Sequence, residues 1–192
     1  MNKYKDVMLY IIVRPIITFL FKILYRPKII GIENIPKNKK IILAGNHTNN
    51  FDCLLLMSST KRNIHFLAKV ELTKGVKKII FNNLGIIPVD RSKKDSNVLK
   101  IAEKYLSNNL VVGIFPEGTT EKGCGYLLPF KIGAVKLASD TNTEIIPFKI
   151  SGDYKLFSKN LKIDFGKPYK AKKDLEKSNK ELYNIINSIK DV

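Results

Sequence analysis

Short apolar runs alternate with amphipathic segments along most of the chain, which is the pattern of an α/β fold. Several of the runs are continuously apolar, as expected of strands that helices cover on both faces. The runs that predict strands are 41–45, 64–68, 86–89, 111–115, 145–150 and 161–165. The amphipathic segments that predict helices are 73–83, a segment capped by Asp95 or Ser96, 131–139 and 175–189.

The first apolar segment, residues 7–24, differs from the others because polar residues interrupt it at four-residue steps. They are Arg14, Thr18, Lys22 and, beyond the run, Arg26, which together mark one stripe of a helix. About 18 helical residues span roughly 27 Å, short of the roughly 30 Å hydrocarbon layer, and charges at its centre are costly. We therefore expect residues 1–28 to form an amphipathic helix, kinked at Pro15, that lies in a membrane interface.

The apolar side of this helix is expected to enter the acyl region of the membrane. Its members are Ile11, Ile12, Ile16, Phe19, Leu20 and Ile23. A core helix that packs on the domain is the alternative, and a true membrane span is a third. A secretory signal is disfavoured because Arg14 and Pro15 break the run and no small-residue cleavage site follows. We expect a peripheral or monotopic protein at the cytoplasmic face of the cell membrane, with residues 29–192 as one domain.

The charge of the chain indicates a polyanionic partner. It carries 34 basic and 17 acidic residues, a formal net charge of +17. Nucleic acid, anionic lipid and phosphorylated substrates all fit that charge, and so does the lysine bias of an AT-rich genome. Because no helix-turn-helix, zinc-finger or RNA-binding signature occurs, we expect no nucleic-acid partner.

The cysteines and histidines are too few and too scattered for a zinc site. They are Cys53, Cys124, His47 and His65, with no CxxC pair. We expect no metal and reduced thiols. No Walker loop or GxGxxG occurs either, which disfavours nucleotide hydrolysis.

A histidine and an aspartate follow the first predicted strand of the domain. The strand 41–45 leads directly into NHTNNFD at 46–52, with His47 and Asp52 five positions apart. Five residues turn about 500° on an ideal helix, so the two would not share a face of one helix. His47 must precede the helix while Asp52, early in it, reaches back, fixes the imidazole tautomer and lets His47 take a proton from an alcohol. A surface histidine beside a helix-capping aspartate is the alternative.

Two further strands end in polar residues. GIIPVDR at 85–91 presents Arg91, whose planar guanidinium binds phosphate or carboxylate, although a surface ion pair would also explain it. FPEGT at 115–119 offers Glu117 and Thr119 as hydrogen-bonding groups and Gly118 for a tight turn, while a helix start near Lys131 favours an anion. An ordinary turn is the alternative for this segment.

The strand 145–150 contains Pro147, which indicates a sheet edge or a strand end that could line an acyl-chain groove. Taken on its own, the segment is better explained by core packing. The strand belongs to a fourth segment, IIPF at 145–148.

In this order, the four segments NHTNNFD, GIIPVDR, FPEGT and IIPF resemble the four sequence blocks of the phospholipid/glycerol acyltransferase family. Its best known members are the 1-acylglycerol-3-phosphate acyltransferases. The connecting segment 66–72 resembles the AKxEL stretch of the family, and 129–138 resembles the segment after its third block. The resemblance implies a mixed β-sheet flanked by helices, with an amphipathic N-terminal part that associates with the membrane.

Roles follow from the resemblance position by position. His47 matches the general base and Asp52 its orienting partner. Arg91, Glu117 and Gly118 match positions that hold the glycerol phosphate, and Pro147 matches the block linked to the acyl side. The implied reaction moves a fatty acyl group from acyl-CoA or acyl carrier protein to a lysophospholipid, and it uses no cofactor.

Two positions depart from the family pattern. Asn49 stands where many members have serine, and Thr120 stands where arginine commonly follows FPEGT. We expect Lys69 or Lys131 to supply the phosphate contact that an arginine would make, and Thr119 to be a further substrate-binding residue. A non-catalytic protein that binds lipid or a membrane surface on the same scaffold is the alternative function, and a hydrolase that activates water is another.

Overall fold

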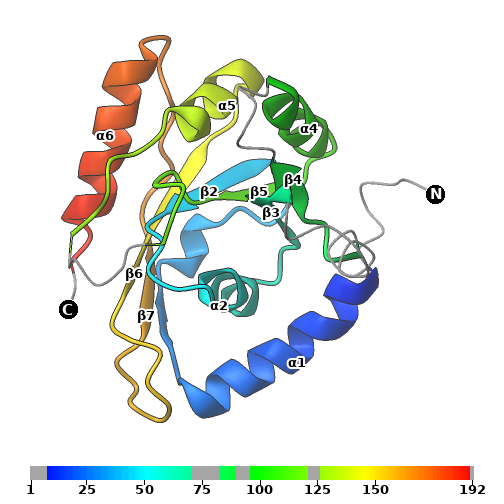
Figure 1. Ribbon diagram of the computed structural model, residues 1–192, viewed down its shortest axis with the longest axis vertical. Coiled ribbons are helices and arrows are strands. Elements are labelled where there is room, and N and C mark those ends of the chain that lie inside the picture. The colour runs from blue at the N-terminus through cyan, green and yellow to red at the C-terminus, as the bar shows by residue number, and fades with distance from the viewer. Residues whose placement is uncertain (1–7, 71–82, 90–95, 121–125, 191–192) are drawn as a thin grey trace.

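The computed structural model describes residues 8–70, 83–89, 96–120 and 126–190 (Figure 1). Seven strands form one sheet in the order β1-β7-β6-β2-β5-β3-β4. The strands are β1 Lys28–Ile30, β2 Ile41–Gly45, β3 Ile64–Lys69, β4 Ile87–Val89, β5 Val111–Ile114, β6 Ile145–Ser151 and β7 Lys162–Phe165. The helices are α1 Met8–Leu24, α2 Asp52–Ser59, α4 Ser96–Ser107, α5 Gly133–Thr141 and α6 Leu175–Ser188, with a short 3-10 helix, η1, at Ile32–Asn34.

The predicted mixed sheet flanked by helices is confirmed. Neighbouring strands are parallel except β6 and β7, which pair antiparallel. Each of the six predicted strands is present, with bounds that agree to within a residue. The sequence pattern missed β1, which is only three residues long and begins with a lysine. Of the predicted helix 73–83, residues 73–82 lie outside the described part of the chain.

The two faces of the sheet support separate cores because side chains alternate along each strand. In β2, Ile41 and Leu43 face the core that α1 and α2 cover, whereas Ile42 and Ala44 face the core under α4, α5 and α6. Figure 1 shows the two groups of helices on opposite sides of the sheet. Burial on both faces explains why β2, the middle strand of the sheet, is a continuous apolar run.

Pro147 is buried inside the sheet, as the core-packing interpretation predicts, and the interpretation as a sheet edge or a strand end is wrong. Strand β6 lies inside the sheet between β2 and β7, and Ala44 of β2 is the register partner of Pro147. The proline is tolerated because β7 ends at Phe165, opposite Phe148, so the antiparallel ladder has stopped one residue short of Pro147. Its carbonyl still accepts a hydrogen bond from the Gly166 N–H at 2.8 Å.

Helix α1 presents apolar residues on two sides. One side packs on the domain, where Tyr10 and Phe21 are buried. The other side exposes all six residues that the sequence assigns to a membrane, and Phe19 has 64% of its surface accessible. The helix therefore combines features of the core and interfacial alternatives. Arg14 differs from expectation, because its guanidinium donates to the carbonyl of Lys61 instead of pointing away from the domain.

His65 is a buried histidine on β3, away from the outer surface. Its Nδ1 pairs with the Gly85 carbonyl at 2.9 Å, and its ring lies 4.4 Å from that of Tyr105. Within the described residues its Nε2 has no hydrogen-bond partner. Burial lowers the pKa of His65 to about 4.

This buried histidine predicts acid sensitivity. Unfolded chains bind a proton at His65 below pH 6.5 and folded chains only near pH 4, so the free energy of unfolding should fall across that window as the pH is lowered. The loss attributable to His65 is about 3 kcal/mol, at 1.36 kcal/mol per pKa unit. Denaturant titrations at pH 7, 5.5 and 4 should show a shallower pH dependence for His65→Phe, and equal slopes would contradict the prediction.

Candidate active site

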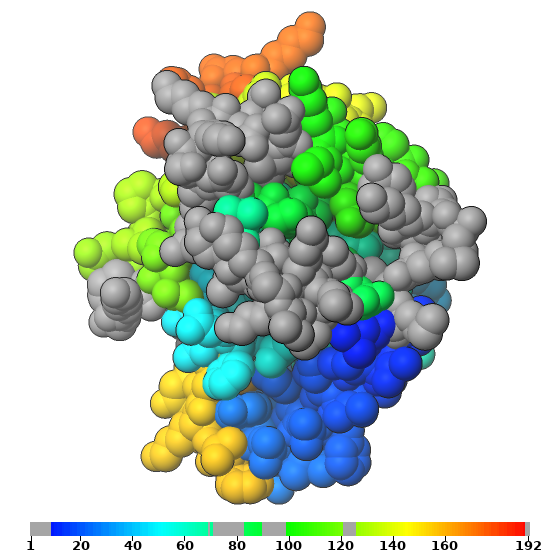
Figure 2. All heavy atoms as spheres, turned by 45° about the vertical axis from the view of Figure 1, so that its right-hand side comes forward, coloured from blue at the N-terminus to red at the C-terminus, as the bar shows by residue number. Residues whose placement is uncertain are grey.

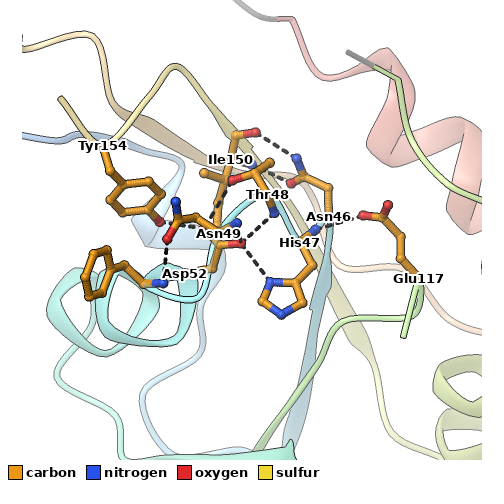
Figure 3. Close-up of polar contacts among 9 residues, drawn as sticks. Asn46, His47, Thr48, Asn49, Asp52, Glu117, Ile150 and Tyr154 are labelled. Carbon is orange, nitrogen blue, oxygen red and sulfur yellow. Dashed lines mark hydrogen bonds and ion pairs between the residues drawn. The ribbon is translucent and has the colours of Figure 1, made fainter. Parts of the chain in front are cut away.

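The loop between β2 and α2 brings His47 and Asp52 together (Figure 3). Strand β2 ends at Gly45 and α2 begins at Asp52, so His47 lies in the loop and Asp52 in the first turn of the helix. His47 Nδ1 and Asp52 Oδ2 are 2.8 Å apart. This is the arrangement that the five-residue spacing predicts.

The Asp52 carboxylate is fully buried and surrounded by donors. Besides His47, the backbone N–H groups of Thr48 and Asn49 donate to Oδ2 at 2.6 and 2.9 Å. The other oxygen, Oδ1, accepts from the Thr48 hydroxyl at 3.2 Å and from the Tyr154 hydroxyl at 2.6 Å. Five donors thus replace the water that a carboxylate loses on burial.

The His47 ring has a fixed orientation and tautomer. It stacks on Phe115 with ring centroids 4.2 Å apart, and 18% of its side chain is accessible. Because a carboxylate only accepts hydrogen bonds, Nδ1 carries the proton and donates to Asp52. The lone pair is then on Nε2, where it can take a proton from a substrate hydroxyl.

Two polar side chains attach this loop to the rest of the sheet. Asn46 pairs with the backbone of Ile150, accepting from its N–H at 2.7 Å and donating to its carbonyl at 2.8 Å. Glu117 is 4% exposed and accepts from the N–H of His47 at 2.8 Å and of Leu128 at 3.0 Å. The carboxylate of Glu117 therefore links the third sequence block to the first through the His47 backbone. A contact between Glu117 and the substrate stays a prediction.

An apolar cavity of about 230 Å³ lies beside His47. Besides His47, its lining residues include Gly118 and Lys131. Gly118 has a left-handed φ of +71°, and a Cβ there would come within 2.8 Å of Lys131 Nζ, so the lysine lies directly over the glycine. The remaining lining residues are Leu67, Val89, Leu99, Ile114, Phe115, Pro116, Gly133 and Ala134.

Other predicted site residues are placed elsewhere or are not described. Thr119 is exposed and is absent from the cavity lining, as is Pro147, which is buried in β6. Arg91 and the side chain of Lys69 lie outside the described part of the structure.

Asn49, one of the two departures from the family pattern, has a clear local role. Its backbone N–H donates to Asp52, and its side-chain Oδ1 accepts from the Phe51 N–H at 3.0 Å. Asparagine commonly stabilises turns in this way. The loop that carries His47 therefore closes without the serine found in many members.

Cys53, which follows Asp52 in the sequence, carries a potential nucleophile. It is a free cysteine, and burial together with the Asp52 charge raises its pKa to about 12. Thiolates, not thiols, are the nucleophiles in cysteine chemistry. A protonated Cys53 is therefore a poor nucleophile.

Comparison with known proteins places this geometry in a family. A family model described as Acyltransferase matches residues 26–151. The 1-acyl-sn-glycerol-3-phosphate acyltransferase of Borreliella burgdorferi is 33% identical over 139 residues, which cover 71% of this chain and 55% of that protein. The protein of the same name from Bacillus subtilis is 29% identical over 148 residues, covering 73% of this chain and 72% of that protein.

A solved structure shows the same fold. The crystal structure of the 1-acyl-sn-glycerophosphate acyltransferase PlsC from Thermotoga maritima matches with a TM-score of 0.74 at 23% identity, covering 93% of this chain and 78% of that chain. The chain spans little more than half the length of the Borreliella relative. Because the family model covers residues 26–151, most of the 192, the chain belongs to the acyltransferase family.

Proposed function

We propose that this protein is a membrane-associated acyltransferase. It moves a fatty acyl group from an acyl thioester to the free hydroxyl of a lysophospholipid, with 1-acylglycerol-3-phosphate as acceptor and phosphatidic acid as product. The observation that carries the proposal is the His47–Asp52 pair, whose histidine lines an apolar cavity. The relatives from Borreliella burgdorferi and Bacillus subtilis are named for this reaction.

The pair supplies general-base catalysis. Nε2 of His47 takes the proton of the acceptor hydroxyl while that oxygen attacks the thioester carbonyl carbon. The carbon–sulfur bond of the resulting tetrahedral adduct then breaks, and the imidazolium returns the proton to the leaving thiolate. Since a thioester is already activated, positioning the two substrates beside one base is sufficient, and the protein needs no covalent intermediate.

The cavity beside His47 suits the two chemical parts of the substrates. Its apolar lining fits the acyl chain near the carbonyl, and the ammonium of Lys131 fits a phosphate. Val89, at the end of β4, borders the cavity two positions before Arg91 in the sequence. We propose that Arg91 and Lys131 bind the phosphate of the acceptor, and that acyl-CoA or acyl carrier protein is the donor.

The outward side of α1 supports attachment to a membrane. The same surface continues into the loop between β6 and β7, where Leu156 and Phe157 are 52% and 58% exposed. The Phe157 N–H donates to the Leu24 carbonyl at 2.6 Å, and Figure 2 shows the gold loop beside the blue helix. Among the described helices none is both long and apolar enough to cross a bilayer. We propose peripheral attachment at the cytoplasmic face, with exposed lysines beside the apolar residues, such as Lys22 and Lys155, contacting anionic lipid.

The membrane proposal predicts a loss of vesicle binding. Ile16 and Phe19 are 55% and 64% exposed, so the double substitution Ile16→Ser with Phe19→Ser should leave the fold intact. Burying one such side chain contributes about 1.5–3 kcal/mol, so losing two should weaken binding by at least roughly 100-fold. Co-sedimentation with phosphatidylglycerol vesicles measures the change. Ile32→Ser, at an exposed position outside α1, is the matched control, and equal binding by both variants would contradict the proposal.

The reaction itself is tested with labelled donors. The purified protein is incubated with acyl-CoA or acyl carrier protein thioesters and 1-acylglycerol-3-phosphate, and the lipid products are resolved. Phosphatidic acid is the expected product. Free fatty acid released without an acceptor would identify a hydrolase. If no product forms with any donor or acceptor while the protein still binds vesicles, the non-catalytic alternative is favoured.

A further inference from the structure

Tyr154, in the loop between β6 and β7, contacts the active site from the side opposite His47 (Figure 3). Its hydroxyl donates to Asp52 Oδ1 at 2.6 Å, whereas His47 Nδ1 is bonded to Oδ2. The Tyr154 ring packs among aromatic residues, with centroids 6.4 Å from Phe21, 5.7 Å from Tyr25 and 5.9 Å from Phe51. These contacts hold the phenol in place next to a carboxylate that is fully buried.

The phenol can act only as a donor in this position. Burial, followed by the charge of Asp52 and the hydrogen bond to it, raises the pKa of Tyr154 far above its usual range. A tyrosine that stays protonated keeps donating to Asp52 at every working pH. Hydrogen bonds between a neutral hydroxyl and a carboxylate are short and strong, which agrees with the 2.6 Å distance.

We infer that Tyr154 is a positioning residue, which sets both the orientation of Asp52 and the basicity of His47 through the hydrogen bond to Oδ1. The inference deepens the proposed acyltransferase function and rests on it for its catalytic part. The argument is electrostatic. A donor on Oδ1 draws negative charge away from Oδ2, and this weakens the support that the carboxylate gives to a protonated His47.

The direction of the effect follows from the groups that face this hydrogen bond. Asp52 and Cys53 come from α2, and Tyr25 follows the end of α1. His47 lies in the loop after β2, and Glu117, which bonds the His47 backbone, lies in the loop after β5. Of these, Asp52 is the group that contacts both Tyr154 and the His47 ring. Without the tyrosine hydroxyl, Asp52 holds more charge for His47, and the imidazole should then bind a proton more readily.

The test is a histidine titration by nuclear magnetic resonance, which needs no activity. The chain has two histidines, so labelled imidazole gives two signals, and the buried His65 serves as the internal reference. Tyr154→Phe keeps the ring and its aromatic contacts while removing only the hydroxyl. The titration midpoint of His47 is expected at a higher pH than in the wild type, by about one unit or less.

A second replacement strengthens the same hydrogen bond instead of removing it. Incorporating 3-fluorotyrosine at position 154 gives a more acidic phenol, which is a stronger donor of nearly the same shape. The His47 midpoint is then expected at a lower pH than in the wild type. Tyr169→Phe is the matched control, because the Tyr169 hydroxyl also donates to a carboxylate, that of Glu181 at 3.0 Å, away from this site.

Enzyme kinetics give a second, separate readout. Tyr154→Phe should lower kcat roughly tenfold with KM nearly unchanged, and it should move the acid limb of the pH–rate profile in the same direction as the midpoint. A His47 midpoint that stays fixed in both Tyr154 variants, or that moves equally in Tyr169→Phe, overturns the inference. A wild type without transferase activity overturns the proposed function instead, while the titration still decides whether Tyr154 acts on His47.

Discussion

Replacing His47 by alanine should lower the rate of acyl transfer by about 10²–10⁴-fold, the usual contribution of a general base. The variant should fold, because the His47 ring is partly accessible and Asp52 keeps four of its five donors. Initial rates of phosphatidic acid formation measure the first effect, and circular dichroism with denaturant titration measures the second.

The other histidine provides the control for this prediction. His65 lies in β3, with its Nδ1 on the Gly85 carbonyl, and has no contact with the cavity beside His47 among the described residues. His65→Phe should therefore keep the transfer rate at pH 7 within a few-fold of the wild type. If His47→Ala lost less than about tenfold, a different group would have to take the hydroxyl proton.

Replacing Asp52 by alanine should damage both folding and catalysis. The substitution leaves five donors in a fully buried site without their acceptor. An unsatisfied buried donor costs about 1–3 kcal/mol, and some of the five would find water, so we expect the free energy of unfolding to fall by about 3–5 kcal/mol. The measurement is chemical denaturation at pH 7, in parallel with the transfer assay.

The conservative substitution Asp52→Asn separates the two effects. The amide oxygen can still accept from some of the donors and fills the same volume, so part of the stability should return. Activity should stay low, because an amide no longer favours the tautomer that leaves the Nε2 lone pair free. The prediction fails if Asp52→Ala unfolds as easily as His47→Ala, since that would mean the buried hydrogen bonds contribute little.

The predictable part of the site is the part encoded by neighbouring residues. His47 and Asp52 are five positions apart, and helical geometry alone requires the turn that joins them. Asn46, Glu117 and Tyr154 make their site contacts with partners 104, 70 and 102 positions away, respectively. Periodicity carries no information on such pairs, and neither Asn46 nor Tyr154 was predicted to have a role.

The difference between neighbouring and distant residues also explains where the prediction of the fold was wrong. An edge was one interpretation of Pro147 because proline cannot donate to a neighbouring strand, but strand β7 ends at Phe165 and the Gly166 N–H beyond it donates to the Pro147 carbonyl. The direction in which the Arg14 side chain points was likewise not predictable from the sequence, because its partner, the Lys61 carbonyl, belongs to the turn after α2. Strand positions depend on local apolar runs and were predictable, whereas these contacts depend on where other segments end.

The aromatic contacts between α1 and Tyr154 bear on how the protein can be handled in the laboratory. Phe21 in α1 and Tyr25 just after it pack on the ring whose hydroxyl holds Asp52. Deleting the N-terminal helix to obtain a better-behaved sample would therefore remove the support of a residue bonded to the reaction centre. Polar substitutions confined to the outward side of the helix are the safer route, and an unrelated lipid anchor fused at residue 29 should not restore full turnover.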